Sequence, residues 1–228
     1  MGNKASVIVA AAGNSSRMGE NKNKQFMIFA GMPVLVHTLL AFENSDEIDE
    51  IIVVTKADSV NSVQDLVNKY GINKVKTVVS GGNTRQISVF KGLSEVSCDK
   101  VLIHDGARPF ITAAEISDIV LALDTNKAVA IGVTPKDTIK KISNENIIEE
   151  TLPRERLVQI QTPQAFHTKD IIAAHKKAIE DNLEVTDDCA LIEYIGIPIK
   201  VILGSYKNIK ITTPEDINLA EAFFGEEL

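Results

Sequence analysis

Five short runs of apolar residues recur along this chain, and their alternation with longer amphipathic stretches limits the folds it can adopt. The apolar runs occupy residues 5–10, 51–55, 75–79, 100–105 and 128–133. Near-continuous runs of this length, bounded by Gly, Asp or Lys, are typical of strands buried on both faces. The amphipathic stretches between them lie at residues 33–44, 59–70, 84–96 and 112–124. This alternation predicts an α/β fold with a mostly parallel sheet and helices on both faces.

The pattern changes after residue 133. Residues 134–160 are polar and hold two short alternating stretches around the turn-prone Asn144-Glu145-Asn146, which predicts a hairpin standing off the sheet. Such a hairpin is either a surface excursion or an arm that docks on another subunit. We favour the arm, because two strands alone cannot bury themselves. Further helices are expected at 167–182, 186–196 and 212–224, with a strand at 198–204. We therefore expect one domain over residues 1–228, with 134–160 as an arm that joins two copies.

Composition limits the partners of the protein. The 228 residues carry a formal net charge of −7, whereas a nucleic-acid-binding face needs clustered cations. No stretch approaches the roughly 18 apolar residues of a membrane span, and the first apolar run is too short for a signal peptide. Cys98 and Cys189 lie far apart without metal-ligand spacing, which fits a reducing compartment. We expect a cytoplasmic protein that binds a small molecule and neither nucleic acid nor membrane.

Three glycine-bearing polar loops follow predicted strands, and each contains an arginine. The loops are residues 10–17, 80–85 and 104–109. Ligands of open parallel sheets bind at the carboxyl ends of the strands. Small residues let backbone amides approach a ligand, and amides with cations are what oligophosphates require. The GxxxxGK[ST] and GxGxxG patterns are absent, which excludes P-loop enzymes and ordinary dinucleotide-binding proteins. The loops therefore predict a nucleotide site of another kind.

Six motifs that keep one order and spacing over essentially the whole chain resemble a single family. They are AAAGNSSRMG with a following NKQF, SGGNTRQISV, HDGARPF, TPKDTIK, QTPQAF and NIKITTPED. The chain resembles the cytidylyltransferases that act on 2-C-methyl-D-erythritol 4-phosphate in the non-mevalonate isoprenoid pathway. The resemblance implies a three-layer, Rossmann-like nucleotidyltransferase fold with a protruding β-arm. It also implies an enzyme that converts CTP and the polyol phosphate to 4-diphosphocytidyl-2-C-methyl-D-erythritol and pyrophosphate. The arm at 134–160 predicts that this enzyme is a homodimer.

The resemblance assigns roles to the residues of the three loops. Those implied to be catalytic, through charges placed on the phosphates, are Arg17, Lys24 and Lys210. Those implied to bind the nucleotide are Ala11, Ala12, Gly13, Gly82, Asn83, Ser88, Asp105 and Ala107. Mg²⁺, or another divalent cation, would bridge the phosphates, with Asp105 as its carboxylate ligand. The family often has Asp where this chain has Asn83, so a backbone contact to the base is expected there. Some members have Asp near Lys207, so no second carboxylate ligand is expected.

The resemblance also implies the residues that bind the acceptor. They are Thr138 and Arg154 on the arm, Thr162 after it, and Arg108. An arginine suits a phosphate dianion because its planar fork donates two charge-assisted hydrogen bonds. From the residues alone, Arg108 is either a phosphate contact or half of a structural ion pair. Asp105 is equally well explained as a turn residue at a strand end.

Three functions remain open at this point. The first is cytidylyl transfer to methylerythritol phosphate, and the second is the same reaction with ribitol 5-phosphate. The third is a nucleotide-binding regulator without turnover, which the presence of all three implied catalytic cations disfavours. The stretches TPKDTIKKI and LPRERL resemble the methylerythritol enzymes more closely.

Overall fold

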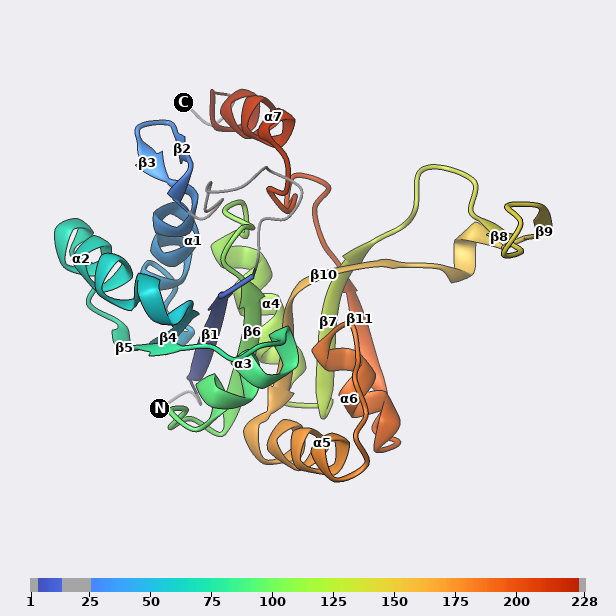
Figure 1. Cartoon of the computed structure of the whole chain (residues 1–228), viewed down its shortest axis with the longest axis horizontal. Coiled ribbons are helices and arrows are strands. Elements are labelled where there is room, and N and C mark those ends of the chain that lie inside the picture. Colours follow the sequence, from blue (N-terminus) through green and yellow to red (C-terminus); the bar gives the residue numbers. More distant parts are fainter. Residues whose placement is uncertain (1–3, 14–25, 226–228) are drawn as a thin grey trace.

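A seven-stranded sheet runs through the centre of the protein (Figure 1). The computed structural model describes residues 4–13 and 26–225. In spatial order the strands are β11 (Ile199–Leu203), β7 (Ala128–Val133), β10 (Gln159–His167), β6 (Lys100–Asp105), β1 (Ala5–Ala11), β4 (Ile48–Thr55) and β5 (Val75–Ser80). Strand β10 is antiparallel to both its neighbours, β6 and β7, whereas the other paired strands are parallel. The predicted mostly parallel sheet is confirmed.

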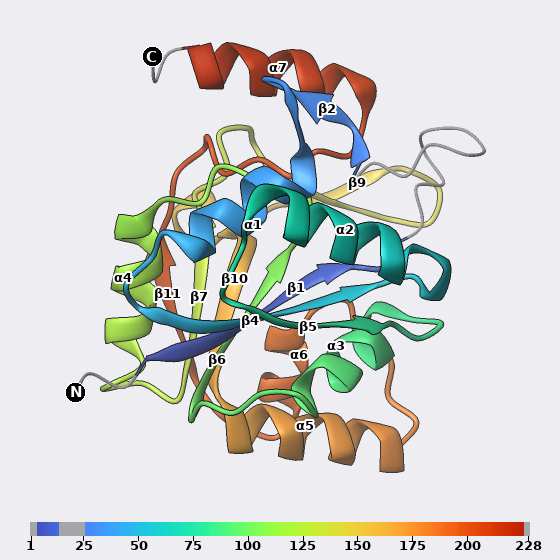
Figure 2. The same cartoon turned by 90° about the vertical axis from the view of Figure 1, so that its left-hand side faces the viewer.

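Helices cover both faces of the sheet and complete three layers (Figure 2). One face carries α1 (Val34–Glu43), α2 (Val60–Tyr70), which follows a 3₁₀ turn at Ala57–Ser59, and α4 (Ala113–Ala122). The other face carries α3 (Arg85–Leu93), α5 (Thr168–Glu180) and α6 (Asp188–Tyr194). Successive residues of β1 enter opposite cores: Val7 and Val9 pack under α1, and Ile8 packs under α3. This is the two-residue period of a strand buried on both faces.

Side chains cap several of these helices. Thr112 Oγ1 accepts from the backbone N–H of Glu115 at 3.2 Å, and Glu115 Oε2 accepts from that of Thr112 at 3.0 Å. This reciprocal pair is a capping box. Asp187 caps α6 by accepting from the backbone N–H of Ala190 at 3.1 Å. None of the described helices is long and apolar enough to cross a membrane.

A smaller cluster of mainly aromatic residues joins the C-terminal helix to a short hairpin at residues 28–33. Helix α7 (Pro214–Gly225) packs over the two-residue strands β2 (Ile28–Phe29) and β3 (Met32–Pro33). The Phe29 and Phe224 rings meet edge to face, with centroids 6.1 Å apart. Near this cluster the buried Ile211 donates its backbone N–H to the carbonyl of Ala107 at 2.8 Å. The cluster therefore holds the segment before α7 against the loop after β6.

The arm projects from the body as a thin hairpin (Figure 1). It contains β8 (Lys140–Ile142), paired with β9 (Ile148–Thr151), and a 3₁₀ turn at Arg154–Arg156. Its isoleucines are solvent-accessible, with exposed fractions of 51% at Ile142 and 62% at Ile147. The predicted range of 134–160 is slightly too long, because Gln159 already begins β10 and pairs with Val133 in the central sheet.

Candidate active site

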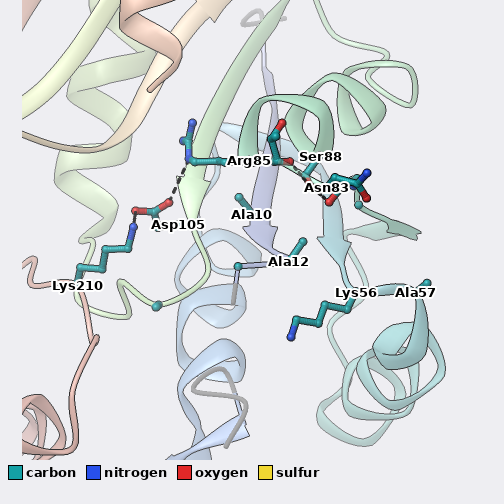
Figure 3. Close-up of a pocket in the computed structure, with 14 residues that line it drawn as sticks. Ala10, Ala12, Lys56, Ala57, Asn83, Arg85, Ser88, Asp105 and Lys210 are labelled. Atoms are coloured by element: carbon teal, nitrogen blue, oxygen red, sulfur yellow. Dashed lines mark hydrogen bonds and ion pairs between the residues drawn. The ribbon is translucent and has the colours of Figure 1, made fainter. Parts of the chain in front are cut away.

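A cavity of about 560 Å³ lies at the carboxyl ends of β1, β4, β5 and β6 (Figure 3). It is lined by Ala10, Ala12, Gly13, Lys56, Ala57, Gly81, Gly82, Asn83, Thr84, Arg85, Ser88, Asp105, Ala107 and Lys210. Eight of the predicted site residues are among these: Ala12, Gly13, Gly82, Asn83, Ser88, Asp105, Ala107 and Lys210. The other two predicted catalytic cations, Arg17 and Lys24, lie outside the described residues. The three separate loops singled out in the sequence therefore meet at one site.

Strand alternation separates the alanines after β1. The side chains of Ala10 and Ala12 line the cavity (Figure 3), whereas Ala11 is 1% exposed and belongs to the core beneath α1. The Ala11 side chain therefore points away from the cavity, and the nucleotide contact that the resemblance implies for Ala11 stays a prediction. The small side chains of Ala10 and Ala12 leave room for a ligand against the backbone.

The loop between β5 and α3 forms a tight polar wall of the cavity. Ser88 Oγ accepts from the backbone N–H of Gly82 at 2.9 Å and donates to the carbonyl of Thr84 at 2.8 Å. A Cβ on Gly81 would lie 2.7 Å from Ser88 Oγ, and one on Gly82 would lie 2.2 Å from Ile87 Cγ2. Only glycine fits at these two positions. The result is a rigid loop in which backbone groups and a hydroxyl can face a small flat base.

Asp105 lies among three cations at the opposite side of the cavity. Its Oδ2 is 2.7 Å from Lys210 Nζ and 3.7 Å from Arg108 Nε, and its Oδ1 is 3.8 Å from Arg85 Nε. Burial by itself would raise the pKa of Asp105, but Lys210, Arg85 and Arg108 outweigh it and lower the pKa to about 2. Figure 3 shows this carboxylate between Lys210 and Arg85. The site therefore carries a permanent anion with an excess of positive charge around it.

A chain of hydrogen bonds fixes Asp105 from behind. The backbone N–H of Asp105 donates to Thr162 Oγ1 at 3.1 Å, and that hydroxyl donates to His104 Nδ1 at 3.1 Å. His104 Nε2 donates to the carbonyl of Arg108 at 3.0 Å, which places a proton on Nε2, and burial lowers the pKa of His104 to about 4, so the ring is neutral at neutral pH. Thr162 is 4% exposed. The structure thus places the Thr162 hydroxyl behind Asp105, and the predicted contact of Thr162 with the acceptor stays a prediction.

Arg108 is also held from within the protein. Its Nη1 donates to the carbonyl of Asn208 at 2.8 Å, and Asn208 Nδ2 donates to the carbonyl of Thr162 at 3.0 Å. The Arg108 side chain is 12% exposed. The sequence left two roles open for Arg108. The ion pair is present, with Asp105 as the partner, and a phosphate contact stays a prediction.

The arm residues lie apart from this cavity within the chain. Thr138 and Arg154 are exposed residues of the projecting arm, and neither lines the cavity. Arg154 Nη1 donates to the carbonyl of Lys136 at 2.7 Å. A site that joins the arm to the nucleotide pocket would therefore need the arm of a second copy.

Lys56 is a cavity residue that the sequence reasoning missed. It follows β4 directly, and its side chain extends toward the cavity (Figure 3). The rule that ligands meet the carboxyl ends of parallel strands applies to β4 as it does to β1, β5 and β6. The loop after β4 contains no glycine, so it lacks the feature by which the other three loops were recognised. Only its position at the end of a parallel strand could have indicated Lys56.

Two buried histidines predict that the fold loses stability in mild acid. Burial lowers the pKa of both His104 and His175 from 6.5 to about 4. Between these values the unfolded chain binds protons that the folded chain does not, so stability is complete above pH 6.5 and falls as the pH drops towards 4. Each histidine should reduce the free energy of unfolding by about 2 kcal/mol at pH 5 relative to pH 7.5. Urea unfolding at both pH values measures this. His175→Gln should halve the difference, and equal stability at both values would contradict the prediction.

Comparisons with known proteins agree with this geometry. Residues 5–226 match the family described as IspD: 2-C-methyl-D-erythritol 4-phosphate cytidylyltransferase. Proteins of that name from Halalkalibacterium halodurans and Clostridium novyi are 44% identical over 223 residues and 45% identical over 217 residues. These alignments cover 97% and 94% of both sequences, respectively.

Solved structures of similar proteins share the whole fold. The structure of 4-diphosphocytidyl-2C-methyl-D-erythritol synthase from Anaerococcus prevotii superposes with a TM-score of 0.87 at 36% identity, covering 98% of this chain and 96% of that one. The 2-C-methyl-D-erythritol 4-phosphate cytidylyltransferase from Thermus thermophilus gives a TM-score of 0.79 at 29% identity, covering 96% and 98%. With the family match extending over residues 5–226, the chain belongs to the 2-C-methyl-D-erythritol 4-phosphate cytidylyltransferase family of nucleotidyltransferases.

Proposed function

We propose that this protein transfers a cytidylyl group from CTP to 2-C-methyl-D-erythritol 4-phosphate, with release of pyrophosphate, in the synthesis of isoprenoid precursors. The observation that carries the proposal is the cavity itself. One side is polar and is formed by the loop that contains Gly81, Gly82 and Ser88. The other side holds Lys210 and Arg85 around Asp105. The names of the curated relatives specify both the nucleotide group and the acceptor.

The reaction needs charge neutralisation more than proton transfer. An acceptor phosphate oxygen attacks the α-phosphorus of CTP, the bond to the bridging oxygen breaks, and pyrophosphate leaves in line. The second pKa of a phosphate monoester is about 6, so the nucleophile is already mostly ionised at neutral pH. Two anions must meet while negative charge grows on the leaving group, and preorganised cations lower this barrier. A site rich in Lys and Arg, with His104 neutral and buried behind it, fits these requirements.

Within the described residues, Lys210 is the cation best placed for this task. It is 38% exposed, lines the cavity and is held at 2.7 Å from Asp105. Its ammonium can exchange Asp105 for a phosphoryl oxygen with little movement, because both partners are anions. Arg17 and Lys24, in the part of the chain that the structure does not describe, are proposed to hold the β- and γ-phosphates.

Mg²⁺ is proposed as the cofactor, with Asp105 as its protein ligand. Mg²⁺ usually binds through one or two carboxylates together with substrate phosphates and retains several waters. Among the described residues, Asp105 is the one ionised carboxylate that lines the cavity, which suits that mode. The same residues contain no cluster of three or more His, Cys, Asp or Glu that would form an all-protein site. When bound, the cation would neutralise charge on the triphosphate.

Nucleotide choice tests the base pocket. We expect kcat/KM for CTP with Mg²⁺ to exceed that for ATP and GTP by at least about 100-fold, because the proposed base contact at Gly82 and Ser88 suits a pyrimidine, and a purine placed there would clash and leave polar groups unpaired. Discrimination against UTP should also favour CTP. Pyrophosphate release with each triphosphate at a fixed acceptor concentration measures these ratios. A purine triphosphate used as well as CTP would refute the assignment of this wall to the base.

The acceptor is tested in the same assay. The alternative enzyme of this reaction type uses ribitol 5-phosphate, which is also a small polyol phosphate. Pyrophosphate release with CTP is expected with 2-C-methyl-D-erythritol 4-phosphate and to be much slower with ribitol 5-phosphate. The reverse order would assign the protein to the alternative, and CTP binding without turnover of either would support a regulator.

A further inference from the structure

Arg85 connects the cavity to a buried carboxylate that lies outside it. Its Nη1 is 2.7 Å from Oδ2 of Asp188, and its Nε is 3.8 Å from Oδ1 of Asp105. Asp188 is the first residue of α6, is 1% exposed and does not line the cavity. Arg85 therefore spans two carboxylates, one at the cavity wall and one in the core under the sheet.

The other oxygen of Asp188 meets a neutral group. Asp188 Oδ1 is 3.8 Å from Nε2 of His175, which is fully buried and stacked on Phe90 with ring centroids 5.4 Å apart. Burial, followed by the nearby charge of Arg85, lowers the pKa of His175 to about 4, so the ring is uncharged at neutral pH. Burial raises the pKa of Asp188, and the Arg85 guanidinium 2.7 Å away opposes that rise, so the charge of this carboxylate depends on Arg85.

The segment before α6 also holds the first turn of α3 directly. Gln86 Nε2 donates to the carbonyl of Leu183 at 3.1 Å, and its Oε1 accepts from the backbone N–H of Val185 at 3.3 Å. The first turn of α3 follows the loop Gly81–Thr84, which forms the wall of the cavity. The position of this loop and of Arg85 therefore depends on contacts made by residues 183–188.

We propose that Asp188 is a positioning residue for the nucleotide site, which it serves by holding Arg85 between the core and Asp105. The proposal rests on the CTP-dependent function proposed above. Without the Asp188 charge, Asp105 is the carboxylate that is still paired with Arg85, and the charge of Asp187 acts on it more weakly. Arg85 would then draw Asp105 away from Lys210, and the start of α3 would lose its ion pair with α6 while keeping the Gln86 hydrogen bonds. Both changes act on CTP binding and leave the arm untouched.

Asp188→Asn is the variant that tests this. It keeps the size of the side chain and removes the charge. We expect KM for CTP to rise about tenfold, in the range seen when a group that orients a site residue is removed, while KM for the polyol phosphate stays unchanged. General destabilisation would lower the active fraction and hence kcat, without changing KM for either substrate. Asp187→Asn is the matched control, because it removes a charge that acts on Arg85 without being paired with it, and asparagine still caps a helix; it should raise KM for CTP much less than Asp188→Asn does.

A double-mutant cycle with Arg85→Gln shows whether Asp188 acts through Arg85. In the Arg85→Gln background, Asp188→Asn should change KM for CTP by less than about twofold, because the side chain through which it acts is absent. A further tenfold rise in that background would overturn the proposal, as would an unchanged KM in the single variant. If Asp188→Asn does not fold, Arg85→Lys replaces it. A single ammonium cannot span both carboxylates, so this variant should raise KM for CTP similarly.

The wild-type protein separates the two proposals. Failure of the wild type to release pyrophosphate with either polyol phosphate would overturn the proposed function. The positioning role of Asp188 would then be tested by calorimetric titration with CTP. There, a Kd for CTP that is the same in the wild type and in Asp188→Asn would overturn the positioning role by itself.

Discussion

Lys210→Ala is expected to lower kcat by about 100-fold or more, the typical loss when one preorganised charge aimed at a transition state is removed. The lysine lines the cavity and lies 2.7 Å from Asp105, so its charge faces the position where phosphoryl oxygens would bind. The fold should persist, because Arg85 and Arg108 remain beside Asp105. Steady-state pyrophosphate release at saturating CTP and acceptor measures kcat.

Lys177→Ala is the matched control for this variant. Lys177 pairs with Asp181 at 2.8 Å on the exposed face of α5, away from the cavity, and such a solvent-screened surface pair contributes little to stability. Its kcat should equal that of the wild type. An unchanged kcat in folded Lys210→Ala would show that Lys210 is only a solvated partner of Asp105.

Mixed dimers of two inactive variants are expected to recover about a quarter of wild-type activity. We predict that the protein is a two-fold dimer in which the arm of one chain completes the site of the other. The arm exposes Ile142, Ile147 and Ile148 on a two-stranded hairpin. Arg154 lies in the 3₁₀ turn that follows β9, outside the cavity of its own chain. Lys210→Ala and Arg154→Ala should each be nearly inactive at low acceptor concentration. Random reassortment makes half of the dimers mixed, and each mixed dimer has one intact site of two.

The two variants are unfolded and refolded together, and the same treatment of each alone is the control. Light scattering reports the oligomeric state before the assay. Arg154→Ala alone should chiefly raise KM for the polyol phosphate, because an arginine on the acceptor phosphate binds ground state and transition state alike. Dimers without recovered activity would place Arg154 in the site of its own chain or in no site. A monomer would remove the arm from any role in assembly.

Strand β10 shows why part of the fold could not be predicted from the sequence. The apolar runs at β1, β4, β6 and β7 match the observed strands within a few residues, because a strand buried on both faces must be apolar. Strand β10 lies between β6 and β7 but contains Gln161, Thr162 and Gln164, which are 2–7% exposed. Gln164 Oε1 accepts from the backbone N–H groups of Asp188 and Cys189 at 3.1 and 3.0 Å. The buried amide of Gln164 thus finds hydrogen-bond partners more than 20 residues away in the chain, and no local sequence pattern predicts such partners.

The alternation of apolar and amphipathic stretches determined the three-layer α/β fold, and the small residues and cations after the strands determined where a phosphate-bearing ligand would bind. These are local properties, because strand burial and the carboxyl-end rule depend on neighbouring residues and on chain direction. Only the tertiary structure decided which charges act together. Asp105 meets Arg85 from the start of α3 and Lys210 from the segment before α7, and Arg85 in turn meets Asp188. Ion pairing depends on distance in space, and packing of the sheet and its two helical layers sets that distance.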